Sequence, residues 1–370
     1  MRLRRCRPLL SRAALAAEQL RGAETAIALL DRARPRNLAA ERQRLSQAFA
    51  AGEAPRPDFR YSAKAELGEV RRNLAHLHAW LSAGDPEQQL LAERAEELEL
   101  EAELAEQVGN PGFSQLAARR FPLGGPALAE LSLQWLAASE HCANDASLLH
   151  ATDDERDPDS LLSLLARRVG AERLPVRVEL DPGLASFAAV ADGVIRIRAG
   201  VRLSAAAARR IAVHEIDGHL LPRLLGKVLG GVFAAGSRRG SDDEEGRALL
   251  LEQRGGMLDA GRRSEIALRY LAVQSLRSGA EFWETVRAVQ PYASSRLGAV
   301  ELACRVHRGG GLGREGVYLS AYVRVSDALA TRPELERLME RGRLAAAAAA
   351  RLLSGSVELD DDRDVVGRLV

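Results

Sequence analysis

Two histidines five positions apart, with a glutamate after the first, constrain this chain more than any other feature of its sequence. His214, Glu215 and His219 lie in an apolar stretch that is typical of a buried helix. Side chains five apart on an ideal α-helix are rotated by about 140° and face different directions. A π-bulge takes up one extra residue, and Gly218 makes that distortion easy for the backbone. The spacing therefore predicts a locally widened helix with both imidazoles on one side.

This set of side chains suits a metal-dependent hydrolase. Two neutral imidazoles can hold a zinc ion, and a neighbouring carboxylate can take a proton from a metal-bound water. Glu215 is placed to be that general base. The chain has only seven histidines, which makes the pairing informative. The short motif alone still leaves a second interpretation open, namely two histidines placed by chance on a buried helix.

A zinc hydrolase also needs a third protein ligand and an open fourth position. The acidic stretch at residues 241–252 is predicted to begin a second helix. Ser241 is the expected N-cap, with Glu244 three residues later as in a capping box. Glu244 or Glu245 would then face the metal. Acidic residues at a helix start also complement the helix dipole, so this second role stays open for either glutamate.

Several ordered motifs in the chain match those of one known family. His214, Glu215 and His219 match an H-E-x-x-x-H helix, and residues 244–248 match a Q-E-G-L-A element with Glu in place of Gln and Arg in place of Leu. In these features the chain resembles the bacterial flavohaemoglobin expression-modulating QEGLA-motif proteins, whose eukaryotic relatives are the microtubule-associated tyrosine carboxypeptidases. The resemblance implies a zincin-like metallopeptidase in which Glu245 is the third zinc ligand.

Two further segments follow the same family pattern. Residues 305–309 match R-V-x-R-G, residues 317–322 match V-Y-L-x-x-Y, and residues 57–61 resemble a P-x-F-x-Y segment. The resemblance therefore spans roughly residues 25–330. The sequence departs from the family inside the histidine motif and at residues 312–315. These departures concern substrate preference more than metal binding.

The segments at residues 305–309 and 317–322 supply candidate substrate-binding residues: Arg305, Arg308, His307 and Tyr318. They can steady an oxyanion or bind a terminal substrate carboxylate, for which an arginine fork is well suited. The alternative is that these side chains pair structurally with helix ends or with the acidic C-terminal tail. Binding of a terminal carboxylate would make the protein a carboxypeptidase. The sequence leaves exopeptidase and endopeptidase activity open.

The sequence thus predicts zinc-dependent hydrolysis of a peptide bond. Zinc is expected to be held by His214, His219 and Glu245, with Glu215 activating a zinc-bound water. The expected partner is a peptide or protein substrate, bound by its C-terminus if the enzyme is a carboxypeptidase. A second hypothesis is a non-catalytic regulatory or binding protein that retains the zinc site, although an intact base beside the metal favours catalysis. A third is a helical scaffold without metal.

Composition narrows the class of protein further. The net charge of +1 gives no sign of a nucleic-acid partner, and no segment approaches the length of a membrane span. Three widely spaced cysteines form neither a disulfide framework nor a cysteine zinc site, which suits a reducing cytoplasm. Residues 2–7 are basic, but charges interrupt the apolar stretch after them, unlike in a secretory signal. We therefore expect a cytoplasmic protein.

Apolar periodicity predicts an α+β, predominantly helical chain, and the family resemblance implies a zincin-like core within it. Residues 1–150 are expected to form a helical N-terminal region, and residues 151–330 the catalytic domain. Residues 331–370 are expected to form a C-terminal helix and an acidic tail at residues 358–364.

A small sheet is predicted just before the histidine helix. Residues 176–180, 186–190 and 194–198 read as its strands, and Ser204 as the N-cap of the helix. Zincins hold a substrate backbone at an edge strand in this position, so the sheet is expected to serve binding. Residues 316–325 are predicted to form one more short strand.

Overall fold

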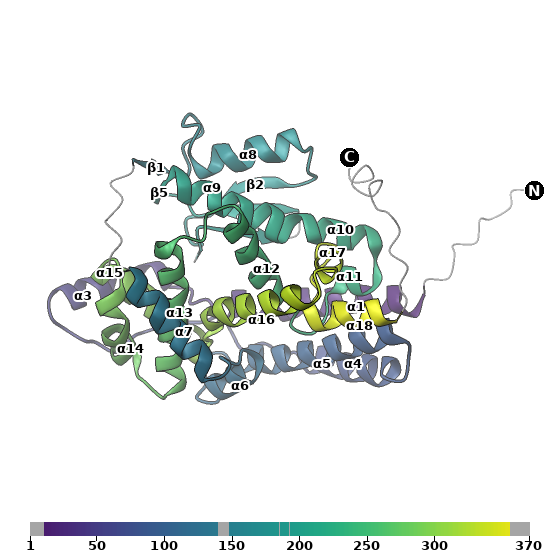
Figure 1. Ribbon diagram of the computed structural model, residues 1–370. Helices are drawn as coiled ribbons and strands as arrows, with labels where there is room; N and C mark the ends of the chain where they lie inside the picture. The colour runs from purple at the N-terminus through teal and green to yellow at the C-terminus, as the bar shows by residue number, and fades with distance from the viewer. Residues whose placement is uncertain (1–10, 140–147, 185, 192, 356–370) are drawn as a thin grey trace, which may run out of the picture.

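A computed structural model describes residues 11–139, 148–184, 186–191 and 193–355. Within these residues the chain is mostly helical and has two small sheets, which confirms the expected predominantly helical α+β class (Figure 1). The basic residues 2–7 and the predicted acidic tail lie outside the described residues. In the part of the chain that is described, no helix is both long and apolar enough to span a membrane.

The elements follow one another along the chain in three groups. The first group is α1 (Arg12–Ile27), α2 (Leu29–Arg32), α3 (Leu38–Ala50), α4 (Gly68–Leu81), α5 (Pro86–Glu106), α6 (Phe113–Arg120) and α7 (Pro126–Ser139). The second is β1 (Leu149–Ala151), α8 (Leu161–Ala171), β2 (Arg177–Leu180), β3 (Ala188–Ala191), β4 (Val194–Ile197), β5 (Arg202–Ser204), α9 (Ala205–Val213), η1 (His214–Leu220), α10 (Leu221–Leu229), α11 (Gly231–Ala235) and α12 (Gly240–Arg254). The third is α13 (Ala260–Arg277), α14 (Phe282–Val289), η2 (Gln290–Tyr292), α15 (Arg296–Gly311), η3 (Arg314–Gly316), α16 (Val317–Thr331), α17 (Leu335–Met339) and α18 (Ala346–Ser354).

The first helices of the chain pack against the last ones. α4 and α5 lie side by side along the bottom of Figure 1, with α1 and α18 next to them. Asp85 caps α5 by accepting a hydrogen bond from the N–H of Gln88, and Pro86 opens the helix. One hydrophobic core runs through these helices and includes the fully buried Leu91 and Ala349. This core spans the domain boundaries predicted near residues 150 and 330, which stay predictions.

The small sheet predicted ahead of the histidine helix is confirmed. Its order is β2-β4-β3, with β2 parallel and β3 antiparallel to β4, so β3 lies at an edge. Leu165 of α8, Ile195 of β4 and Ile216 of η1 are fully buried in a shared core. Ser204 caps α9 as expected, because its Oγ accepts a hydrogen bond from the N–H of Ala207. This core holds the histidine helix against the sheet.

The predicted strand at residues 316–325 is wrong, because this segment forms most of helix α16. Its β-branched and aromatic side chains favour strands locally. Val317, Ala321 and Val325 nevertheless recur every four residues, the spacing of a helical face, and all three are buried. α16 packs so closely on α12 that a Cβ at Gly246 would collide with the carbonyl of Ala321. Tertiary packing therefore overrides the local preference.

Candidate metal centre

The histidine helix widens where the sequence predicts that it should. Residues 214–220 form the π-helix η1, in which the closing hydrogen bond is one residue longer than in an α-helix. This turn places the ring centroids of His214 and His219 4.9 Å apart. Gly218 lets the widened turn approach α12, since a Cβ there would lie 2.6 Å from the Cβ of Ala248. The predicted π-bulge is confirmed.

Glu245 of α12 completes the cluster around the two histidines. Its Oε2 lies 3.2 Å from Nε2 of His214 and 3.5 Å from Nε2 of His219. One donor atom from each of the three residues lies within 4.8 Å of the others, and all three residues are buried. The second oxygen of Glu245 accepts a 2.9 Å hydrogen bond from Arg314. Of the two glutamates that the sequence leaves open, Glu245 is the one that faces both Nε2 atoms.

Glu244 has a different set of contacts. Both of its oxygens accept hydrogen bonds from Arg223, at 2.9 and 2.6 Å. Its Oε2 also lies 3.1 Å from Nδ1 of His219, the nitrogen on the outer side of that ring. Glu244 therefore lies behind His219, close to its outer nitrogen but without a hydrogen bond to it, while Glu245 faces the inner nitrogen.

Glu252 lies behind His214, on the outer nitrogen of its ring, and was not among the predicted site residues. Nδ1 of His214 lies 2.7 Å from Oε1 of Glu252, which is itself held by Arg262 at 2.9 and 3.1 Å. Glu252 follows Glu245 by seven residues and so lies on the same face of α12. That spacing was the signal available in the sequence.

The carboxylates around the centre favour positive charge at the histidines. Burial alone would lower the pKa of His219, but Glu244 and Glu245 raise it to about 10. Burial likewise opposes ionisation of Glu245, yet His219, His214 and Arg314 keep its pKa well below the ordinary value. Buried carboxylates thus stay charged beside the imidazoles and stabilise positive charge on the rings.

A pocket of about 70 Å³ opens beside the cluster and contains several of the predicted site residues. His214, Glu215, Arg305 and Tyr318 all line it. Ala188 of the edge strand β3 lines it as well, so the strand and His214 of the metal cluster face the same pocket. The structure therefore brings the predicted base and two of the four predicted substrate-binding residues to the metal-binding side chains.

The other two predicted substrate-binding residues do not line this pocket. Nε2 of His307 lies 2.9 Å from Oγ1 of Thr285, and its ring packs edge-on against Phe282. Burial lowers the pKa of His307 to about 4, so it is a neutral, half-buried residue. Arg308 is buried and contacts Glu315 at 3.3 Å. Both residues therefore make structural contacts, although these are with Thr285 inside α14 and Glu315 of η3, and the acidic tail lies outside the described residues.

The second helix of the site begins differently from the prediction. α12 starts at Gly240, so Ser241 lies inside the first turn and is not the N-cap. The residue before it, Arg239, adopts a left-handed φ of 60°, and its N–H donates to Glu97 at 2.9 Å. A Cβ at Gly240 would collide with the carbonyl of Arg343. Contacts with distant segments, rather than a capping side chain, define this helix start.

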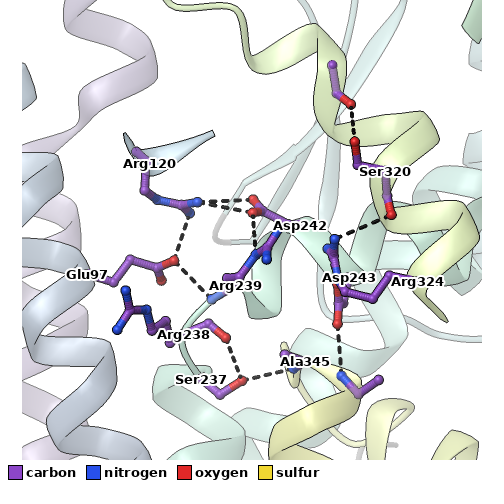
Figure 2. Close-up of polar contacts among 12 residues, drawn as sticks. Glu97, Arg120, Ser237, Arg238, Arg239, Asp242, Asp243, Ser320, Arg324 and Ala345 are labelled. Atoms are coloured by element: carbon purple, nitrogen blue, oxygen red, sulfur yellow. Dashed lines mark hydrogen bonds and ion pairs between the residues drawn. The ribbon is translucent and has the colours of Figure 1, made fainter. Parts of the chain in front are cut away.

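Arginines and backbone groups fix the first turn of α12 in place (Figure 2). Asp242 accepts hydrogen bonds from Arg120 of α6 at 3.1 and 3.3 Å. Asp243 accepts a 2.7 Å hydrogen bond from Arg324 of α16 and a 2.9 Å bond from the N–H of Ala346. These contacts tie three helices to the turn that precedes Glu245, and so they set its position relative to the histidines.

The chain matches one protein family over most of its length. The sequence model described as microtubule-associated tyrosine carboxypeptidase matches residues 46–356, which include the histidines, Glu245 and the pocket. No curated protein and no solved structure gives a significant match. The chain therefore belongs to the microtubule-associated tyrosine carboxypeptidase family.

Proposed function

We propose that this protein is a zinc-dependent metallopeptidase of the carboxypeptidase type. The observation that carries the proposal is the position of Glu245 Oε2, within 3.2 and 3.5 Å of the two histidine Nε2 atoms. Two imidazole nitrogens and one carboxylate oxygen form a donor set used by catalytic zinc sites, with the fourth position open. The family's name describes a carboxypeptidase, which supports the same reaction class.

The atoms behind the three donors also fit a metal. Nδ1 of His214 is bonded to Glu252, so its Nε2 remains for a ligand bond, and Arg314 occupies the other oxygen of Glu245. Histidines that bind metals usually direct their second nitrogen to a carboxylate in this way. When bound, zinc would polarise the scissile carbonyl and lower the pKa of a water molecule toward about 7.

Glu215 supplies the proton transfer in this proposal. Its side chain lines the pocket directly beside His214. Glu215 takes a proton from the attacking water as the new C–O bond forms, and it delivers a proton to the leaving amine as the C–N bond breaks. Arg305 and Tyr318 line the same pocket and are among its hydrogen-bond donors, and Tyr318 is a candidate to stabilise the carbonyl oxygen as it becomes negative.

The sheet supports a zincin-like core within the proposed catalytic domain of residues 151–330. β3 is an edge strand, and Ala188 places it at the pocket. An extended peptide can pair with such an edge through backbone hydrogen bonds and so cross the metal centre. The order of the motifs further supports a place among the QEGLA-motif proteins.

Metal analysis is the first test of the proposal. Purified wild-type protein should contain about one zinc ion per chain by mass spectrometry. The His219→Ala variant should lose it, whereas His76→Ala, which changes an exposed histidine of α4, should keep it. Wild-type protein that binds no zinc even after zinc is added would end the enzyme proposal and leave the helical scaffold.

Peptide hydrolysis then separates an enzyme from a regulator. The Glu215→Gln variant should keep zinc and lose at least about 100-fold in turnover, because it has no proton acceptor at this position. Zinc-loaded wild-type protein that cleaves no more peptide than Glu215→Gln would instead support the non-catalytic zinc-binding protein.

A further inference from the structure

Arg269 of α13 carries a half-buried charge, and the described part of the chain provides no hydrogen-bond acceptor for it. Its guanidinium lies 4.9 Å from the ring centroid of Tyr318, and no described carboxylate or carbonyl accepts a hydrogen bond from it. Burial lowers the pKa of Arg269 to about 10, and the positive charges of Arg305 and Arg262 act in the same direction. Arg262, on the same helix, contrasts with it, because it donates to two glutamates.

Arg269 stands where two pockets meet. It lines the 70 Å³ pocket at the metal cluster and a second pocket of about 210 Å³ beside it. Both pockets share the same wall, which consists of Ser186, Phe187, Glu265, Arg269 and Arg305. A group bound at this wall is therefore adjacent to the metal-binding side chains on one side and to the larger cavity on the other.

The larger pocket has the character of a side-chain cavity. Leu38, Leu268 and Leu302 contribute apolar walls. Its two other arginines, Arg42 and Arg198, both lie near Glu301, at 3.4 and 3.7 Å. A cavity of about 150 Å³ is enough to hold a benzene ring, so about 210 Å³ accommodates an aromatic or long aliphatic side chain.

We propose that Arg269, together with Arg305, binds the C-terminal carboxylate of the substrate, and that the 210 Å³ pocket takes the side chain of the terminal residue. This inference rests on the proposed peptidase function. In a carboxypeptidase substrate only one residue separates the scissile carbonyl from the terminal carboxylate. With the carbonyl at the metal cluster, the shared wall is the neighbouring position, and a guanidinium there can form a two-pronged contact with a carboxylate.

Binding to a slow variant tests the assignment without interference from turnover. In zinc-loaded Glu215→Gln protein, a peptide ending in phenylalanine with a free carboxylate should bind about 10- to 100-fold tighter than the same peptide with a C-terminal amide. Adding Arg269→Met should remove this difference by weakening only the free acid. Arg263→Met is the matched control and should keep it, because Arg263 of α13 also contacts an aromatic ring, that of Trp135, and lines neither pocket.

The assignment is wrong if the Glu215→Gln protein does not distinguish acid from amide, or if Arg269→Met weakens both peptides equally. Zinc content checks that each variant is folded. If Arg269→Met is not, Arg269→Lys carries the same test, since lysine keeps the charge without the fork and should lose part of the preference. A third outcome separates the two proposals. If the Glu215→Gln protein prefers the free acid through Arg269 but zinc-loaded wild-type protein hydrolyses neither peptide, the binding site stands and the peptidase function is rejected.

The pocket can be tested separately through the size of the terminal residue. Ala293 lines the larger pocket, so Ala293→Phe should fill part of it. Wild-type protein is expected to prefer peptides ending in phenylalanine over those ending in glycine, and Ala293→Phe should reduce or reverse this preference. An unchanged order of preference in Ala293→Phe would show that the terminal side chain lies elsewhere.

Discussion

Helix α12 carries buried carboxylates at two places about one turn apart, and their oxygen atoms have different kinds of partner. At its start, Asp242 and Asp243 are bonded to Arg120, Arg324 and the backbone of α18, and we call these residues the closed cluster. At the metal centre, Glu245 has one oxygen on Arg314, while the other faces two histidine nitrogens. The first set completes its contacts within the chain, and the second leaves donors pointing at a common position.

This difference separates a structural use of buried charge from a functional one. Buried ion pairs contribute little net stability, because desolvation offsets much of their attraction, but they hold segments in a defined register. The closed cluster does this for the first turn of α12 (Figure 2). At the metal centre, buried charge instead accompanies three potential ligands whose donor atoms lie close together. A bound cation would supply the partner that these donor atoms share.

The largest effect should come from Glu245→Gln. The amide loses the negative charge and leaves Arg314 without its partner, so zinc binding should weaken by more than the about 10- to 100-fold typical of residues that only support a ligand. Competition with a fluorescent zinc chelator measures this. Asp242→Asn on the same helix is the matched control and should bind zinc as wild type does. Equal losses in both variants would show that α12 acts as one structural unit.

A second closed network, at Glu24, should control stability in acid. Burial raises the pKa of Glu24, but Arg94 and Arg343 outweigh it and lower the pKa to about 2 from 4.5. A lowered carboxyl pKa stabilises the fold above pH 4.5, and this contribution disappears as the pH falls toward 2. At neutral pH, this pKa shift of Glu24 corresponds to about 3 kcal/mol of stability relative to the fold with Glu24 protonated.

Denaturant unfolding of wild type and Glu24→Gln across this pH range checks the prediction. The variant should be less stable at pH 7, and the difference should shrink steadily between pH 4.5 and 2. A difference that stays constant with pH would mean that packing of α1, rather than the charge of Glu24, explains the loss.

Local spacing is enough to predict that the two histidines of the metal centre meet. His214 and His219 share one widened turn, and that geometry follows from their separation and from Gly218. Glu252 was also predictable in principle, because it shares a helical face with Glu245. The start of α12 was not, because Arg239 and Gly240 take their conformation from contacts with segments far away in the sequence.

The pocket was less predictable, because it depends on how α13, α15 and α16 pack. Arg305 lines it, but His307 on the same helix is rotated by about 200° and packs against Thr285 and Phe282 instead. A motif marks both residues alike and does not show which one turns inward. Arg269 lies in a segment without any motif, so its place beside Tyr318 appears only in three dimensions.

A smaller effect is expected when a partner of a ligand, rather than the ligand, is changed. Glu252→Gln keeps the shape of the side chain but weakens the charged contact to Nδ1 of His214. Zinc affinity should fall by about 10- to 100-fold, with about one zinc ion still bound at saturation. The chelator competition used for Glu245→Gln measures it. Unchanged affinity would show that Arg262 and the packing of η1 orient His214 without Glu252.

The smallest effect belongs to Asp242→Asn in the closed cluster. Arg120 keeps its contacts with Glu101 at 2.7 Å and Glu97 at 3.4 Å, so the variant does not leave a buried charge unpaired. The loss should therefore be about 1–2 kcal/mol in the free energy of unfolding, measured in denaturant. Zinc affinity and peptide hydrolysis should remain at wild-type values, because Glu245 keeps its own contacts. A drop in zinc affinity as large as that of Glu252→Gln would mean that the closed cluster tunes the metal centre directly, and the two uses of buried charge would no longer be separable.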